Sequence, residues 1–197
     1  AAVDPRNVER QTGRIRALRE AGRWEEARAA FQQSLPDGLD NAGFLLEGAQ
    51  VLEQAGDFRA LAVLYQRLEG LLPDNAVVKF HIGLNRLRIN QNTPALAALR
   101  DAERLGLTER ALWVNLGTAL ARLDQVDEAL TYLERAAPDY ATDPSAYVYT
   151  FALRQKLCDW RGHDNLDREL LAPAVAASGD GYPALPFPFT AYPGAID

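Results

Sequence analysis

The feature that most constrains this chain of 197 residues is a repeat with a period of about 34 residues. Gly22 recurs as Gly56, and Gly83 recurs as Gly117. A period of this length is typical of helical hairpins that stack, because each hairpin is unable to bury its apolar face alone. One position of the period is always large and apolar, and its residues are Phe31, Tyr65, Leu99 and Leu133.

The fourth hairpin shows the pattern most clearly and is predicted to begin near Arg110. Trp113 and Leu116 recur at helical spacing, which places them on one face of its first helix. We expect Gly117 to lie where two helices approach closely, because a side chain there would push them apart. Asp124 is predicted to close this helix.

The two hairpins before it depart from the pattern in informative ways. The turn Asn90–Pro94 of the third hairpin predicts Thr93 as the N-cap of the next helix and Pro94 as its first residue. In the second hairpin the close-contact position is Ala49, and Leu61 stands where a small residue is expected. We therefore expect the helices of this hairpin to pack differently.

These repeats resemble the tetratricopeptide repeat family over roughly residues 8–141. The resemblance implies an all-α fold, a right-handed solenoid of about four helical hairpins with a capping helix and a Pro-rich tail. An unrelated helical bundle with accidental spacing is the alternative. The family pattern is matched most closely by Trp113, Leu116, Gly117, Ala129, Leu133 and Ala136.

The repeat register ends near Tyr140, and two further parts are expected. Residues 142–178 are predicted to form capping and bridging helices, with Asp143 as a cap and Pro144 in the first turn. The tail, residues 179–197, is rich in Pro and aromatic residues and either docks on the solenoid or begins a further domain. The residues expected to face inward from the capping helix, covering the fourth hairpin, are Tyr147, Phe151 and either Leu153 or Arg154.

The stretch Arg154–Trp160, with the sequence Arg-Gln-Lys-Leu-Cys-Asp-Trp, carries a second resemblance. It is similar to the bridge that follows the repeats of O-linked N-acetylglucosamine transferases, bacterial members included. That resemblance implies a larger glycosyltransferase with a UDP-sugar donor. The catalytic lobes of that family have no counterpart in this sequence, so none of their catalytic or donor-binding residues is carried over.

Composition argues against chemistry within the chain itself. One cysteine, Cys158, excludes an internal disulfide, and His81 and His163 are the only histidines, so we expect no metal site, no cofactor and no catalytic residue. Cys158 is predicted to be a buried, inert thiol and His163 a surface or capping residue. The net charge of −6 argues against a nucleic-acid partner.

Location is inferred from further absences in the sequence. No apolar run is long enough to cross a membrane, and no secretory signal is visible, so a cytoplasmic protein with no membrane partner is expected. The chain contains no methionine, its first residue included, so we expect it to be part of a longer protein.

Binding is predicted on the first helices of the hairpins, which line the concave groove in the family that this chain resembles. Amide side chains there can hydrogen-bond an extended backbone without reading its sequence. The transferases often carry an asparagine ladder, of which only Asn115 remains here. The predicted groove residues are Glu47, Gln50, Gln54, His81, Arg88, Asn115, Thr118 and Arg122.

Three functions follow as alternatives. The first is an interaction module that binds a protein or peptide for a larger transferase. The second is a free-standing adaptor that assembles a complex, with homo-oligomerisation left open. The third, an enzyme within this chain, has no spacing of carboxylates, histidines or glycines to support it.

Overall fold

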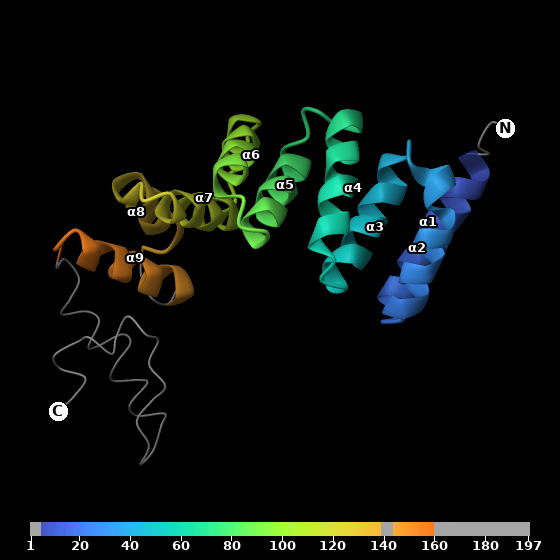
Figure 1. Cartoon of the computed structure of the whole chain (residues 1–197), viewed down its shortest axis with the longest axis horizontal. Helices are drawn as coiled ribbons and strands as arrows, with labels where there is room; N and C mark the ends of the chain where they lie inside the picture. The colour runs from blue at the N-terminus through green and yellow to red at the C-terminus, as the bar shows by residue number, and fades with distance from the viewer. Residues whose placement is uncertain (1–4, 139–143, 160–197) are drawn as a thin grey trace, which may run out of the picture. The chain divides into compact units, whose positions relative to one another are not determined.

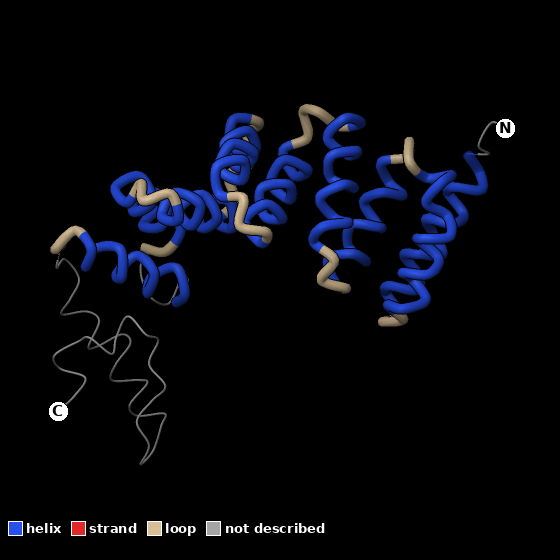
Figure 2. The backbone as a smooth tube through the Cα atoms, in the orientation of Figure 1, coloured by secondary structure: helices blue, strands red, loops and turns tan. Residues whose placement is uncertain are grey.

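The computed structural model describes residues 5–138 and 144–159, apart from the side chains of residues 144, 145, 147 and 148. Within these residues the fold is all-α, with nine helices and no strand, as predicted (Figures 1 and 2). The chain divides into two compact units, Ala1–Asn115 and Leu116–Asp197. The helices are α1 (Pro5–Glu20), α2 (Trp24–Gly38), α3 (Ala42–Gln54), α4 (Phe58–Leu71), α5 (Ala76–Arg88), α6 (Asn92–Arg104), α7 (Arg110–Arg122), α8 (Val126–Ala136) and α9 (Pro144–Lys156).

Each of the first four hairpins turns at a residue with left-handed backbone conformation. The backbone angle φ of this residue is +72° at Gly22, +68° at Gly56, +63° at Asn90 and +60° at Asp124. Successive members of this series lie one repeat period apart. Glycine adopts this conformation at little cost, and Asn and Asp tolerate it better than other residues do. The prediction that Asp124 closes its helix is therefore confirmed.

Hydrogen bonds around these residues end one helix and begin the next. In the second turn the N–H of Gly56 donates to the Glu53 carbonyl at 3.0 Å, and the N–H of Asp57 donates to the Leu52 carbonyl at 3.0 Å. This pair of bonds is the Schellman motif, which satisfies carbonyls at a helix end. Asp57 then caps α4, because its side chain accepts from the Ala60 N–H.

The predicted N-cap of α6 was wrong. The helix begins at Asn92 with Gln91 as its N-cap, so Thr93 and Pro94 lie in its first turn. The left-handed residue Asn90 fixes this start, because the second helix of every hairpin begins two residues after its left-handed residue. Pro94 is tolerated because the first four N–H groups of a helix have no partner inside the helix.

Besides the Asp57 cap, two other side-chain caps were not predicted from the sequence. Asn41 accepts from the Phe44 N–H at 2.9 Å at the start of α3, and Asn75 accepts from the Val78 N–H at 3.0 Å at the start of α5. The two asparagines lie one period of the repeat apart, so their recurrence in the sequence could have predicted both caps. Each cap positions the start of a first helix of a hairpin.

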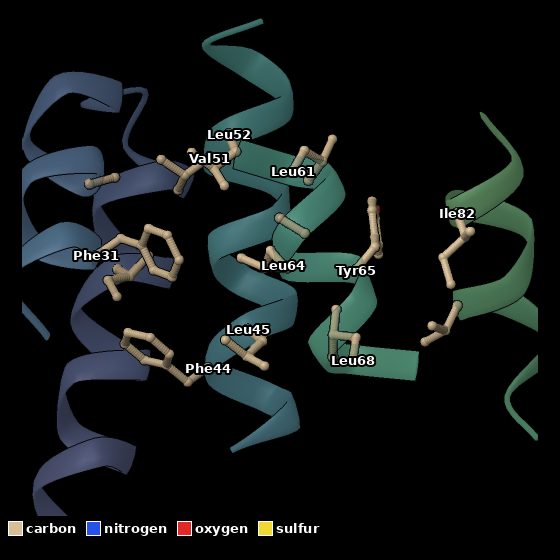
Figure 3. Packing of buried hydrophobic residues seen from close by; sticks show 14 of the residues in the cluster. Phe31, Phe44, Leu45, Val51, Leu52, Leu61, Leu64, Tyr65, Leu68 and Ile82 are labelled. Atoms are coloured by element: carbon tan, nitrogen blue, oxygen red, sulfur yellow. The ribbon is translucent and has the colours of Figure 1, made fainter. Parts of the chain in front are cut away.

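The core of the first unit runs from α1 to α6 through large side chains that pack on small residues (Figure 3). A Cβ built on Gly48 would lie 2.0 Å from Phe31 Cε2, so the ring of Phe31 fills the space above this glycine. Phe31 also stacks on Phe44, with ring centroids 5.2 Å apart. Gly48 therefore joins the second hairpin to α2. The different packing expected at Ala49 and Leu61 stays a prediction.

The third and fourth hairpins instead use a glycine on the first helix against a leucine on the second. A Cβ on Gly83 would lie 2.6 Å from Leu99 Cδ2. In the second unit, a Cβ on Gly117 would lie 2.5 Å from Leu133 Cγ and 3.1 Å from the Ala129 carbonyl oxygen. The predicted close approach at Gly117 is confirmed.

In the second unit α9 packs on α8, and this agrees with a capping helix. Phe151 and Leu153 are buried, and Arg154 donates to the Glu134 carboxylate at 2.8 Å. Pro144 opens the helix as predicted. The predictions for Asp143, the Tyr147 side chain, Trp160, His163 and the tail lie outside the described residues.

The prediction of a buried Cys158 was wrong, because this thiol is exposed. Cys158 lies just past the end of α9 with a φ of +54°, and its N–H donates to the Gln155 carbonyl at 3.1 Å. It therefore terminates the helix rather than packing inside it.

Among the described residues, no helix has the length and apolar character needed to cross a membrane.

Replacing Gly117 with alanine tests the close approach of α7 and α8. The new methyl group would collide with Leu133, so we expect a loss of ~1–3 kcal/mol in the free energy of unfolding. Gly70→Ala is the matched control, since a Cβ there meets nothing within 4 Å. The control should gain ~0.4–1 kcal/mol. Urea denaturation measures both variants, and equal effects would contradict the assigned contact.

Candidate functional site

The candidate site in the first unit is formed by the first helices of its hairpins, α1, α3 and α5. Contacts between side chains place these helices next to one another in the order α1, α3, α5. We call this surface the first-helix face. Its residues are Arg16, Arg19, Leu46, Glu47, Gln50, Glu53, Gln54, Val77, His81 and Arg88.

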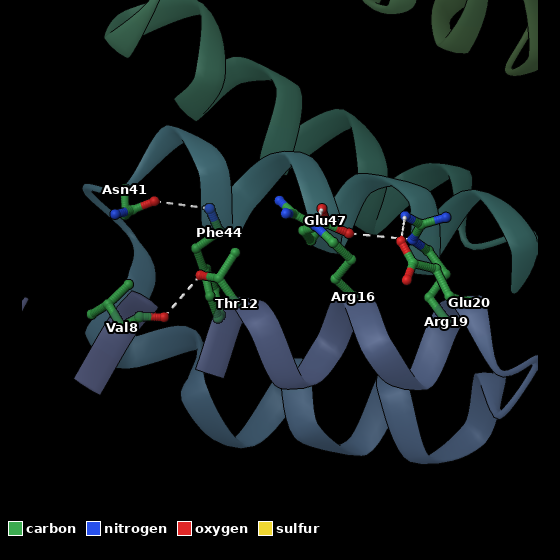
Figure 4. Close-up of polar contacts among 8 residues, drawn as sticks. All are labelled: Val8, Thr12, Arg16, Arg19, Glu20, Asn41, Phe44 and Glu47. Carbon is green, nitrogen blue, oxygen red and sulfur yellow. Dashed lines mark hydrogen bonds and ion pairs between the residues drawn. The ribbon is translucent and has the colours of Figure 1, made fainter. Parts of the chain in front are cut away.

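Glu47 ties α3 to α1 and is the most buried of the predicted groove residues (Figure 4). Its side chain accepts from Arg16 Nε at 2.6 Å and from Arg19 Nε at 3.2 Å, and the residue is only 6% exposed. Glu47 therefore joins two hairpins rather than offering a free side chain to a ligand. Two arginines from the neighbouring hairpin supply the charge that makes burial of this carboxylate tolerable.

Arg88 ties α5 to α3 in the same way. Its Nη1 donates to Glu53 Oε1 at 2.6 Å, and its guanidinium lies 5.2 Å from the centroid of the Phe58 ring. The cation–π contact and the ion pair together fix the guanidinium over the start of α4. Arg88 remains exposed, so its outer N–H groups can still meet a ligand.

His81 lies half-buried between aromatic rings. It stacks on Tyr65 with centroids 6.1 Å apart and planes at 10°, and Phe80 meets it edge-on at 5.5 Å. Burial lowers the pKa of His81, and the negative charge of Glu53 opposes that shift. A neutral imidazole offers both a donor and an acceptor nitrogen at the surface.

The remaining exposed side chains of the face are amides and aliphatic groups. Gln50 and Gln54 are exposed on α3. Leu46 is 39% exposed, and Val77, on α5, is 50% exposed. Together they offer hydrogen bonds for a backbone and apolar contacts for side chains.

The other three predicted groove residues lie on α7. Asn115, half-buried, ends the first unit, and its Nδ2 donates to the Ala111 carbonyl at 2.7 Å. Thr118 and Arg122 belong to the second unit. There the positive charge of Arg122 partly offsets the effect of burial, which raises the pKa of Tyr149 on α9.

Several contributors to this face were not identified from the sequence. Arg16, Arg19 and Glu53 complete its ion pairs, yet only Glu47 and Arg88 were predicted. Their separations along the chain differ from pair to pair, so the repeat period alone does not reveal them. No cluster of His, Cys, Asp or Glu with the arrangement of a metal site exists within residues 5–138 and 144–159.

Hairpins that recur at a fixed period and turn at a left-handed residue define a helical repeat protein. The tetratricopeptide repeat model matches residues 12–76 and 81–144. The chain belongs to the tetratricopeptide repeat family, which confirms the resemblance of its repeats to that family. No curated protein matches the chain.

Solved structures of the same fold cover most of the chain. MamA from Desulfovibrio magneticus RS-1, from residue 41 to its end, is 16% identical, with a TM-score of 0.72 over 91% of this chain and 100% of that one. YrrB, described as a tetratricopeptide repeat protein with an unusual peptide-binding site, is 20% identical, with a TM-score of 0.62 over 76% and 79%. PilF of Pseudomonas aeruginosa is 16% identical, with a TM-score of 0.66 over 84% and 75%. Such low identities show the fold alone.

His81 should make stability depend on pH. Because burial holds its pKa below the ordinary 6.5, the unfolded chain takes up the proton first on acidification. Stability is therefore fully present above the ordinary pKa and is lost as the pH falls through the folded-state pKa.

The measurement compares the wild type with His81→Gln by urea denaturation at about pH 7.5 and about pH 5, on either side of the ordinary histidine pKa. We expect the wild type to lose more free energy of unfolding than the variant over this interval. An equal loss in both proteins would show that His81 does not titrate differently in the two states.

Proposed function

We propose that this chain is a protein-interaction scaffold that holds an extended peptide on the first-helix face. The observation that carries the proposal is the continuity of that face. Glu47 joins α3 to α1, and Arg88 joins α5 to α3, so exposed amides and aliphatic groups from consecutive hairpins form one surface. Surfaces built from consecutive repeats in this way commonly bind polypeptides.

The chemistry of the face favours a peptide backbone over a charged ligand. Glu47 and Glu53 already have arginine partners, so the strongest charges on the face are largely compensated. Gln50 and Gln54 each offer a donor and an acceptor to an extended backbone. Leu46 and Val77 supply apolar contacts for alternate side chains of the ligand. The structural similarity to YrrB, a protein described as having an unusual peptide-binding site, supports this direction.

We propose, more narrowly, that the repeats serve a larger O-linked N-acetylglucosamine transferase-like protein and present acceptor polypeptides to it. The stretch Arg154–Trp160 supports this through its resemblance to the bridge of that family. The packing of α9 on α8 is consistent with a bridge that begins directly on the last hairpin. A free-standing adaptor is the competing function.

Substituting the two exposed glutamines tests the peptide-binding proposal. Peptides are selected from a displayed random library against the whole chain, and the dissociation constant of the best binder is measured by calorimetry. Gln50→Ala with Gln54→Ala should weaken binding about tenfold through the loss of backbone hydrogen bonds.

The matched control is Gln32→Ala with Gln33→Ala, which removes two exposed glutamines from α2. Its affinity should equal that of the wild type. If the control loses as much affinity as the α3 variant, or if the α3 variant loses none, the peptide does not lie on the first-helix face.

The narrower proposal has its own test in the encoding gene. Read past the codon for Asp197, the frame should continue into a two-lobed nucleotide-sugar fold. The encoded protein should then transfer the sugar from a UDP-sugar to a polypeptide. A frame that ends there, or that continues into another fold, would favour the adaptor.

A further inference from the structure

A pocket of about 340 Å³ lies in the first unit among α4, α5 and the start of α6. Tyr65 and Ile82, which face each other from α4 and α5 in Figure 3, are part of its wall. None of its lining residues belongs to the first-helix face. Its volume falls at the lower end of the range for small-ligand sites.

Two consecutive residues of the pocket break the repeat pattern. At the position of Asn85 the second and fourth hairpins carry Val51 and Ala119, and at the position of Arg86 they carry Leu52 and Leu120. All four of these aliphatic residues are buried. The third hairpin alone of these three thus replaces two adjacent core residues with polar ones, and both of them line the pocket.

The side chain of Asn85 is deeply buried, and only one of its two polar atoms has a hydrogen-bond partner. Its Nδ2 donates to the Phe58 carbonyl at 3.1 Å, but its Oδ1 has no hydrogen-bond partner, and the residue is 2% exposed. A buried acceptor left unpaired costs about 1–3 kcal/mol. This Oδ1 has almost no accessible surface in the structure, so a ligand that brings a donor, such as an N–H group, satisfies it only by displacing the lining around it.

Arg86, in contrast, is a hydrogen-bond donor and favours an acceptor on the ligand. Its guanidinium donates to the Pro94 carbonyl at 3.1 Å and forms no ion pair within the described part of the chain. The guanidinium has five N–H groups in a fixed fork, which suits a carboxylate. An acceptor oxygen, preferably an anionic one, is thus favoured beside Asn85.

The acidic residue of the pocket does not exclude an anion. Glu69 accepts from Lys79 Nζ at 2.7 Å, and Asp101 lies 3.9 Å from the same nitrogen. The charge of Glu69 is therefore compensated from outside the pocket wall. Gln66 and Gln91 add neutral amides to the lining.

We propose that this pocket binds a carboxylate that has an N–H group on the adjacent carbon. The carboxylate pairs with Arg86, and the N–H donates to Asn85 Oδ1. A free amino acid and the C-terminal residue of a peptide share this chemistry. The site is separate from the peptide surface proposed above and does not depend on it.

The test is a titration of the whole ¹⁵N-labelled chain, observed at the backbone amides of Arg86 and Gln91. N-acetyl-L-alanine represents the end of a peptide, and L-alanine represents the free amino acid. N-acetyl-L-alaninamide keeps the N–H but lacks the carboxylate. We expect one of the first two probes to give saturable shifts, with a midpoint about tenfold lower than that of the amide.

Two variants copy the second hairpin, Asn85→Val and Arg86→Leu. Each should raise the midpoint at least about tenfold by removing one partner. Asn85→Val should also retain or raise the thermal midpoint, because it removes a half-satisfied polar group from the core. That readout separates lost binding from lost folding.

Saturation by L-alanine alone identifies a free amino acid as the ligand, and saturation by N-acetyl-L-alanine identifies a peptide end; either supports the proposal. No saturable shift with any probe would mean that at most water meets Asn85 Oδ1, which overturns it. Equal binding of the acid and the amide, or unchanged midpoints in folded variants, would overturn it as well.

Discussion

The left-handed residue between paired helices is the constraint on which the other features depend. Gly22, Gly56, Asn90 and Asp124 each end a first helix and let the second begin after one intervening residue. The Schellman motif ends the first helix at this residue, and the second helix begins two residues later in every hairpin. The register of each hairpin therefore follows from the position of this residue. Every later contact across the hairpin, including Gly83 on Leu99, depends on that register.

Stacking of the hairpins then places side chains from consecutive first helices against one another. Within the first unit, Arg19 reaches Glu47 and Arg88 reaches Glu53, so polar contacts as well as the core join neighbouring hairpins. These pairs leave amide and aliphatic groups as the surface available to a ligand. The proposed peptide-binding surface is thus a consequence of how the repeats are joined.

Features that recur at the repeat period could be predicted from the sequence. Contacts that differ from one pair of neighbouring hairpins to the next could not. The all-α hairpins and the close approach at Gly117 follow from one residue type recurring at one step. The burial of Glu47 could not be predicted from its own helix, because the arginines that compensate it come from α1. The pocket at Asn85 could have been found, since comparison with Val51 and Ala119 already shows a polar residue at a core position.

Chemical-shift mapping of a selected peptide on the ¹⁵N-labelled chain tests the central claim, that the first-helix face recognises an extended backbone. We predict that the largest shifts fall on α3 and α5, including the side-chain amides of Gln50 and Gln54. Shifts confined to the second helices α2 and α4 would contradict it.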